Sequence, residues 1–302
     1  MLPKVYIILL NWNGVTYTLQ CLESLKKVQY FSISVIVVDN NSSGNDVEIM
    51  IEHYGQFINK VIANTSNLGF AGGNNVGIKY AIDNSADYIL LLNNDTIIEP
   101  NLVEVLLEKI VNQKKIGIVA PQINYFDEPN KIWTEGGKIS KLRGAGCADS
   151  RRIEDGKSKV DREVSFVSGC CMLINKEVFQ KVGLFDESFF LYVEDTDFCY
   201  RTFSSGYKIV VTNDTKIYHK VSSSTKKEYT ALPLYYTTRN RLFFAKKNFP
   251  YFYFITFTYI FFVMLLKCIV FFLQGKRSNV KIILKAFKDF GTGKMGKANL
   301  KF

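Results

Sequence analysis

The stretch DYILLLNNDT, residues 87–96, joins an apolar run to an abruptly polar end. Its apolar part is too short for a typical helix and favours a buried β-strand. Two earlier segments have the same plan, KVYIILLN at residues 4–11 and ISVIVVDN at residues 33–40. The first of these is too short for the core of a signal peptide, so we interpret it as a strand as well.

Segments with helical spacing separate these strands. Residues 16–28 repeat leucine every third position, and residues 76–82 and 102–110 are predicted as further helices, the last after Pro100 at a helix start. Strands that alternate with helices of this length imply βαβ units. The sequence therefore predicts an α/β fold with a mostly parallel, Rossmann-like sheet flanked by helices.

Each of the three strands ends in asparagine or aspartate, at Asn11, Asp39 and residues 93–95. In an open parallel sheet, ligands bind at the carboxyl ends of the strands. Three polar ends on one edge are what a nucleotide-binding crevice needs. Ordinary polar loops are the alternative for any one of them.

Two later segments are less regular. NLGFAGGNN, residues 67–75, is rich in glycine but lacks the GxGxxG spacing. We expect it to form a turn before the next helix, either one that approaches a phosphate closely or a plain tight turn. Residues 124–163 are polar, glycine-rich and weakly periodic, which predicts a long, mobile excursion.

Composition narrows the class of protein. The 302 residues carry a formal net charge of +10, which is compatible with nucleic acid, an anionic membrane surface or a phosphorylated substrate as partner. Residues 276–302 hold eight Lys or Arg and one acid, so the excess belongs largely to the C-terminus. No nucleic-acid motif accompanies it, and nucleic acid is the least favoured partner. The six cysteines form no CxxC pair, which favours a reducing compartment.

The C-terminal region is apolar and then basic. Residues 249–273 are long enough to span a bilayer but contain Pro250 and Lys267, and both flanks are basic, which gives no orientation for a single crossing. Residues 279–290 place lysines on one face and apolar residues opposite, typical of a helix that lies in a membrane interface. A core helix with a solvated lysine face is the alternative. We expect a membrane-associating helical region over residues 231–302.

Three carboxylates crowd the stretch FFLYVEDTDFCYR, residues 189–201. Aromatic neighbours and like charges raise the pKa of a carboxyl group, which suits a general base. Acids in the first turn also stabilise a helix, and Asp197 with Arg201 makes an i,i+4 pair. Both interpretations hold, for different residues. Asp95 is a candidate ligand for Mg²⁺ or Mn²⁺, with helix capping as the alternative, and His219 follows a strand where it could complete that site.

Taken in order, these motifs resemble the family 2 glycosyltransferases. The resemblance rests on LLNWNG, VIVVDNNSSGND, NLGFAGGNN, YILLLNNDTIIEP, SGCCMLINKEVFQKVGLFDESFFLYVEDTDFCYR and YHKVSSST, and covers roughly residues 4–225. The bacterial rhamnosyltransferase-like branch is the most similar. The resemblance implies a GT-A fold over residues 1–230, a nucleotide-sugar donor, a divalent metal and inversion at the anomeric carbon.

The resemblance also assigns roles on the donor side. Asn11 and Trp12 would lie beside the base, Asp39 would accept a hydrogen bond from the pyrimidine N3–H, and Asn67 and Gly69 would border the nucleoside. These assignments place the nucleoside at the first strand ends.

For the metal and the chemistry, Asn93, Asn94 and Asp95 would occupy the family's acidic triplet, with Asp95 as the retained acid. An amide at position 93 is a weaker ligand than the aspartate of many relatives. His219 would add a metal contact. On the acceptor side, Gly169 would line the site, Glu194 would place the helix start and touch the acceptor, and Asp195 would be the general base.

The expected function is an inverting glycosyltransferase that acts on a lipid-linked saccharide at the cytoplasmic face of the cell membrane, in surface-polysaccharide assembly. dTDP-rhamnose is the first choice of donor, and UDP-hexoses or UDP-N-acetylhexosamines are alternatives. A non-catalytic saccharide-binding subunit with the same fold is the competing hypothesis.

Overall fold

The apolar runs with polar ends form the centre of a sheet. The computed structural model describes residues 2–111, 113–148, 161–220 and 231–300. Strand β1 (Val5–Asn11) lies between β2 (Ile33–Asp39) and β4 (Tyr88–Asn93) and pairs with both in parallel. Asn11 and Asp39 are register partners, so two of the predicted polar ends lie side by side.

The sheet continues on both sides of these three strands. Its other members are β3 (Lys60–Ala63), β5 (Thr96–Ile98), β6 (Ile116–Tyr125), β7 (Ile132–Thr134), β10 (Arg162–Val164), β11 (Cys171–Asn175) and β12 (Lys208–His219). The order is β10–β12–β6–β11–β4–β1–β2–β3, with β5 and β7 paired to β12 and β6. Strand β11 runs antiparallel to both of its neighbours. The prediction of a mostly parallel sheet is confirmed.

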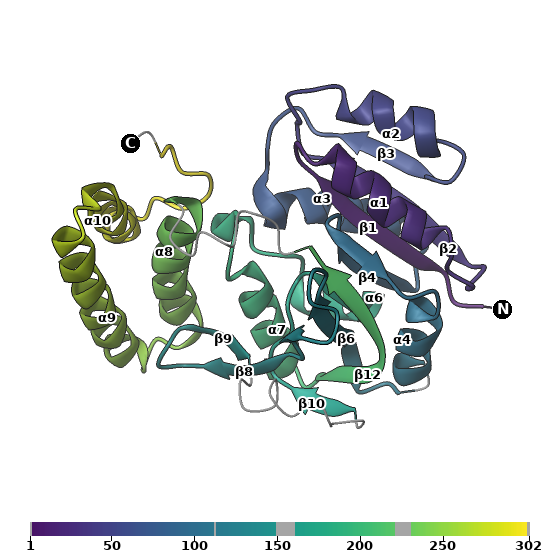
Figure 1. Ribbon diagram of the computed structural model, residues 1–302. Coiled ribbons are helices and arrows are strands. Elements are labelled where there is room, and N and C mark those ends of the chain that lie inside the picture. The colour runs from purple at the N-terminus through teal and green to yellow at the C-terminus, as the bar shows by residue number, and fades with distance from the viewer. Residues whose placement is uncertain (1, 112, 149–160, 221–230, 301–302) are drawn as a thin grey trace.

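Helices cover both faces of the sheet (Figure 1). One face packs against α1 (Val15–Leu25), α2 (Asp46–Tyr54) and α4 (Leu102–Ile110); the other packs against α3 (Gly69–Asp83), α6 (Lys176–Val182) and α7 (Glu194–Ser204). Residues along β1 alternate between the two cores: Ile7 and Leu9 belong to the first and Ile8 to the second. This alternation is the period-two geometry of a strand buried on both faces.

The glycine-rich segment departs from its predicted structure. It forms the first turns of α3, which begins at Gly69, where a turn was expected up to residue 75. A Cβ at Gly73 would lie 2.5 Å from a methyl of Leu10, and one at Gly77 would lie 2.7 Å from a methyl of Ile8. The turn prediction was therefore wrong, because these glycines allow the helix to pack closely on β1.

The polar excursion is also more ordered than its sequence suggested. Its described part contains β7, the hairpin of β8 (Gly137–Ser140) and β9 (Ala145–Ala148), and β10. Residues 149–160 of the excursion lie outside the described part of the chain. The prediction of an irregular excursion is wrong for the described strands, because inter-strand pairing gives them regular structure that their weak periodicity did not indicate.

Three helices follow at the C-terminal end, away from the central strands: the first lies beside α7 and the other two pack against it on its far side (Figure 1). These are α8 (Ala231–Asn248), α9 (Tyr253–Leu273) and α10 (Arg277–Gly291). Helix α9 has 21 residues and a mean hydropathy of 2.3, and only 22% of its most apolar window is buried. Among the described residues it is the one helix that is long and apolar enough to cross a membrane.

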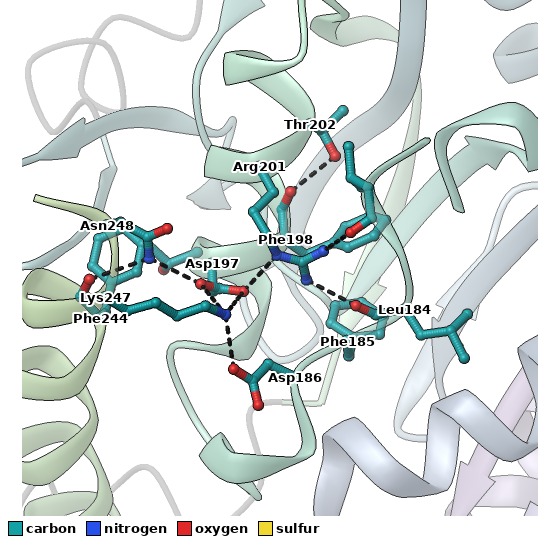
Figure 2. Close-up of polar contacts among 12 residues, drawn as sticks. Leu184, Phe185, Asp186, Asp197, Phe198, Arg201, Thr202, Phe244, Lys247 and Asn248 are labelled. Atoms are coloured by element: carbon teal, nitrogen blue, oxygen red, sulfur yellow. Dashed lines mark hydrogen bonds and ion pairs between the residues drawn. The ribbon is translucent and has the colours of Figure 1, made fainter. Parts of the chain in front are cut away.

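A buried ionic cluster joins the C-terminal helices to the sheet (Figure 2). The Asp197 carboxylate on α7 is fully buried and accepts hydrogen bonds from Arg201 Nε at 2.7 Å and Asn248 Nδ2 at 2.9 Å. Lys247 Nζ on α8 lies 3.0 Å from the same carboxylate and 2.7 Å from Asp186 Oδ2. The predicted Asp197–Arg201 pair is confirmed. It is the centre of a larger cluster that connects two helices and the segment before α7.

Replacing Asp197 with asparagine should lower the free energy of unfolding by about 3 kcal/mol, because it leaves the partly buried Arg201 without its carboxylate and Lys247 with Asp186 alone. Urea denaturation checks this value. Glu163→Gln is the matched control, since the Glu163–Lys208 pair is nearly half exposed and should contribute less than about 1 kcal/mol. Equal losses in the two variants would contradict the role assigned to the buried cluster.

Candidate functional site

The strand ends are held together by the side chain of Asn11. Its Nδ2 donates to Asp39 Oδ1 at 2.8 Å, to Asp46 Oδ2 at 2.9 Å and to Ser42 Oγ at 3.2 Å. Its Oδ1 accepts a hydrogen bond from Thr18 Oγ1 at 2.7 Å. Asn11 is fully buried, so its side chain organises the loops around the site. Asp46, Ser42 and Thr18 were not identified from the sequence.

Asp39 lies at the end of β2 with little exposure. Its Oδ1 accepts from Asn11 and from Ser42 Oγ, and its Oδ2 accepts from the Ser42 backbone N–H at 2.9 Å. An ionised carboxylate has about four acceptor positions, so Oδ2 retains one. Next to this cluster, the Trp12 ring is about half exposed and can offer an apolar face to a ligand.

A cavity of about 330 Å³ opens beside these strand ends. Strand ends, the start of α3, the segment before α7, helix α8 and the C-terminal segment all contribute to its wall. It is lined by Leu10, Trp12, Asn40, Asn41, Asn67, Gly69, Phe70, Phe190, Leu191, Leu232, Tyr236, Lys297 and Ala298. The sequence placed Trp12, Asn67 and Gly69 here. It did not predict the wall from α8 and the C-terminal segment.

Gly69 brings this cavity into contact with the segment that precedes α7. Its φ of +73° is accessible to glycine, and a Cβ there would lie 2.2 Å from the carbonyl oxygen of Phe190. The same oxygen accepts a hydrogen bond from the Phe70 N–H at 2.7 Å. Asn67 Oδ1 supports the turn by accepting from the Gly69 N–H at 2.8 Å.

Asp95 and His219 meet because β5 and β12 are paired, with His219 opposite Thr96. His219 Nε2 lies 3.1 Å from Asp95 Oδ1. The two groups are not aligned as a hydrogen bond, and Asp95 Oδ1 and His219 Nδ1 are both buried without a hydrogen-bond partner among the described residues. The unsatisfied Asp95 Oδ1 and the neighbouring His219 Nε2 are an oxygen and a nitrogen that could both coordinate one divalent cation.

The other two residues of the Asn-Asn-Asp triplet, Asn93 and Asn94, differ in their hydrogen bonds. Asn94 Nδ2 donates to Thr18 Oγ1 at 2.8 Å, whereas the Asn93 side chain makes no hydrogen bond to any described residue. Within the described ranges, no cluster of three or more His, Cys, Asp or Glu side chains is arranged to hold a metal ion. A cation between Asp95 and His219 would therefore need its remaining ligands from a donor diphosphate and water, which is the usual arrangement for Mg²⁺.

Asp195 and Gly169 are brought together, as the predicted acceptor side requires. Asp195 Oδ2 accepts the Gly169 N–H at 3.1 Å, and its Oδ1 accepts the Thr196 N–H at 2.6 Å. Asp195 remains partly exposed, whereas Glu194 is only 5% exposed and its Oε2 has no hydrogen-bond partner among the described residues. The two adjacent acids therefore differ in accessibility.

Their environments also shift their titration. Burial raises the pKa of Glu194 well above its usual range, and the adjacent Asp195 carboxylate raises it further. Burial raises the pKa of Asp195 too, against the hydrogen bonds from Gly169 and Thr196 that lower it. Glu194 is therefore best accommodated in its neutral form, whereas the carboxylate of Asp195 is stabilised by two backbone N–H groups.

Comparison with known sequences identifies the family. The model of Glycosyl transferase family 2 matches residues 6–183. The low-salt glycan biosynthesis hexosyltransferase Agl10 of Haloferax volcanii is 30% identical over 67% of this chain and 62% of its own. The dTDP-rhamnosyl transferase RfbF of Shigella flexneri is 24% identical over 82% of each chain. The N-acetylglucosaminyl-diphospho-decaprenol L-rhamnosyltransferase of Mycobacterium tuberculosis is 22% identical over 68% of this chain and 73% of its own. The chain belongs to glycosyl transferase family 2, in its rhamnosyltransferase-like branch.

Solved structures agree on the fold. The mannosyltransferase PcManGT from Pyrobaculum calidifontis, in complex with GDP-Man and Mn²⁺, has a TM-score of 0.60 at 12% identity over 99% of this chain and 77% of its own. GalNAc-T7 with UDP, GalNAc and Mn²⁺ has a TM-score of 0.61 at 16% identity, over 72% of this chain and 44% of its own. At these identities the likeness shows a GT-A-like fold. The chain spans less than two thirds of Agl10 and of GalNAc-T7.

The raised pKa of Glu194 has a consequence for stability. A carboxyl with a raised pKa in the folded state stabilises fully below its unfolded value of about 4.3, and this stabilisation is lost as the pH rises towards the folded pKa. The contribution of Glu194 to the free energy of unfolding should therefore fall as the pH rises above about 4.3, and the Glu194→Gln variant should lack this contribution. Urea denaturation at several pH values checks this, with the exposed Glu52→Gln as control. Parallel pH curves for wild type and Glu194→Gln would contradict the assignment.

Proposed function

We propose that this family 2 glycosyltransferase moves a sugar from a nucleotide-sugar donor to a hydroxyl of a lipid-linked saccharide, with inversion, in the assembly of a cell-surface polysaccharide. The observation that carries the proposal is the placement of Asp195. It is held by the Gly169 N–H, remains partly exposed, and follows the segment that contacts the cavity at Gly69. A base beside a nucleotide-sized cavity is what direct displacement requires.

In the proposed reaction, Asp195 accepts the proton of the acceptor hydroxyl as that oxygen forms a bond to the anomeric carbon. The bond from this carbon to the donor phosphate oxygen breaks, and its electron pair leaves with the nucleoside diphosphate. When bound at Asp95 and His219, a divalent cation, Mg²⁺ or Mn²⁺, supplies positive charge to the leaving diphosphate. Attack from the face opposite the leaving group accounts for inversion.

On the donor side, the nucleoside occupies the cavity beside Trp12, Asn67 and Gly69, and the free acceptor position of Asp39 receives the pyrimidine N3–H. dTDP-rhamnose is our first choice of donor because two relatives are named as rhamnosyl transferases, one of them for dTDP. UDP-hexoses and UDP-N-acetylhexosamines are the alternatives, since thymine and uracil differ by one methyl group, which a pocket discriminates by only about 1–3 kcal/mol.

The lipid-linked acceptor is supported by the C-terminal helices and by one relative, whose name includes a decaprenol diphosphate. Helix α9 exposes a row of large apolar side chains, including Phe254, Leu266 and Phe272. An apolar groove of about 640 Å³ runs between α9 and α10, with Lys246 and Lys288 among its lining residues. We propose that residues 231–302 dock the catalytic part, residues 1–230, on the cytoplasmic face of the cell membrane, where an apolar surface flanked by lysines suits an anionic bilayer.

A non-catalytic saccharide-binding subunit remains the second candidate, since Asn93 replaces an acid in the metal triplet. A panel of radiolabelled dTDP-, UDP- and GDP-linked sugars, tested with Mg²⁺ and with Mn²⁺, separates it from an enzyme. If any donor is turned over, the binding-subunit hypothesis is rejected. If donors bind but none of them is turned over, the hypothesis is supported.

Asp195→Asn should lower kcat for sugar transfer by at least 100-fold, because it removes the general base, while nucleotide affinity stays within about threefold. Transfer of labelled sugar to a vesicle-embedded lipid-linked acceptor measures the first quantity, and nucleotide titration measures the second. Asp83→Asn, at an exposed position at the end of α3, is the control. Full turnover by Asp195→Asn would refute the base assignment.

The double variant Leu266→Glu/Phe272→Glu should weaken binding to anionic vesicles at least tenfold, because each exposed apolar side chain contributes about 1.5–3 kcal/mol when removed from water. Co-sedimentation at low and high salt measures it, with Phe31→Glu as control, since Phe31 is almost fully exposed before β2. If the wild-type protein still co-sediments with vesicles at high salt and binds no oligonucleotide, the result agrees with insertion of α9 into the bilayer. Equal loss in Phe31→Glu would contradict a role specific to α9.

A further inference from the structure

The segment that leads into α7 has an unusual backbone. Phe190, Tyr192 and Val193 have φ values of 63°, 66° and 73°, in the left-handed region. Positive φ is uncommon for residues other than glycine, and for a β-branched or bulky side chain it is an outlier. Such conformations persist when surrounding contacts over-determine them, and they concentrate at functional sites. Val193 immediately precedes α7, so its backbone conformation sets the direction in which the helix starts and hence the position of Asp195.

The contacts that hold this segment come from α8. Asn240 is fully buried, and its Nδ2 donates to the carbonyl oxygens of Phe189 at 2.9 Å, Leu191 at 2.9 Å and Tyr192 at 2.8 Å. One amide group thus contacts three carbonyls of the strained segment. Phe189 O also accepts the Leu191 N–H at 2.7 Å, so Asn240 matters most for the carbonyls of Leu191 and Tyr192.

Arg239 fixes the orientation of that amide. Its Nε donates to Asn240 Oδ1 at 3.0 Å, which leaves Nδ2 facing the segment, and its Nη2 donates to Phe189 O at 3.3 Å. Its Nη1 donates to Gly296 O at 2.9 Å in the C-terminal segment. The guanidinium is 1% exposed and lies near the rings of Tyr235 and Tyr236. The buried Arg239 side chain therefore holds three segments in fixed positions relative to one another: α8, the segment at Phe189 and the C-terminal segment at Gly296.

The strained segment in turn touches both halves of the site. Phe190 O accepts the Phe70 N–H at the start of α3, beside the cavity, and Val193 O accepts the Asp197 N–H in the first turn of α7. Gly296 N–H donates to Ser188 O at 2.8 Å, and Lys297 and Ala298 then line the cavity. The position of this segment therefore sets the distance between the cavity and Asp195.

We infer that Arg239 and Asn240 are positioning residues for the transfer reaction. They hold residues 189–193 in the strained conformation that presents Asp195 at Gly169. This inference rests on the proposed function for its catalytic consequence, and on geometry alone for its effect on the segment. If Arg239 and Asn240 had a purely structural role, replacing them would lower stability but would not lower kcat selectively while the donor KM stayed unchanged.

Asn240→Asp tests the inference, because it replaces the donating amide with an acceptor that cannot bond the three carbonyls. Hydrogen exchange of peptides that cover residues 189–197 should become at least tenfold faster. kcat should fall at least tenfold, while the donor KM stays within about threefold. Thr238→Val is the matched control, since Thr238 is equally buried on α8 but contacts only Leu234 O and Met264 Sδ. It should change neither quantity by more than twofold.

Asn240→Ser, which keeps one donor, is used in the same assays if Asn240→Asp does not fold, and the same thresholds apply. Unchanged exchange, retained kcat, or equal changes in Thr238→Val would each overturn the inference. If the wild-type protein transfers no sugar from any donor, the proposed function fails. The exchange comparison then still decides whether Asn240 holds the segment.

Discussion

The Asp197 carboxylate is the constraint on which the arrangement of this molecule depends. It is buried between α7 and α8, and its partners Arg201, Lys247 and Asn248 come from both helices. Arg201 also donates to the carbonyls of Val182 and Leu184, so the segment before α7 is fixed by the same cluster. A charge buried this deeply requires all of its partners in place. The orientation of α8 relative to the sheet is therefore tied to the start of α7, where Asp195, the proposed general base, lies.

That connection explains how two distant parts of the sequence form one site. The cavity proposed for the donor is bounded by strand ends near the N-terminus and by α8 and residues 297–298 near the C-terminus. The segment 189–193 lies between them, anchored by Gly69 on one side and Asn240 on the other. If the C-terminal helices rest on a membrane, the same contacts orient the cavity and Asp195 relative to that surface. Docking and catalysis would then share one rigid connection.

The sequence was sufficient for the features with strong local signals. The apolar runs with polar ends predicted β1, β2 and β4, and the order of motifs predicted the family. Both signals lie within short stretches of sequence, as hydrophobic periodicity and turn-forming residues. The start of α3 was missed because glycine has low helix propensity, and only contact with Leu10 and Ile8 explains its use there. Asn240 was missed for another reason: its partners lie 48–51 residues away and no local pattern indicates them. Asp46 was missed in the same way, since its role appears through hydrogen bonds from Asn11 and from the Gly14 N–H, more than thirty residues away.

The crowding of acids before and within α7 is resolved by three different environments. Asp197 is paired with the cations of Arg201 and Lys247. Glu194 is buried beside a carboxylate and has an unsatisfied oxygen, and Asp195 is partly exposed with two backbone N–H donors. A neutral Glu194 places no like charge beside Asp195, whose pKa is already raised by burial. If Glu194 were instead ionised, it would raise the pKa of Asp195 further and leave less of it in the basic form. The neighbouring acid therefore supports the base by not carrying a charge.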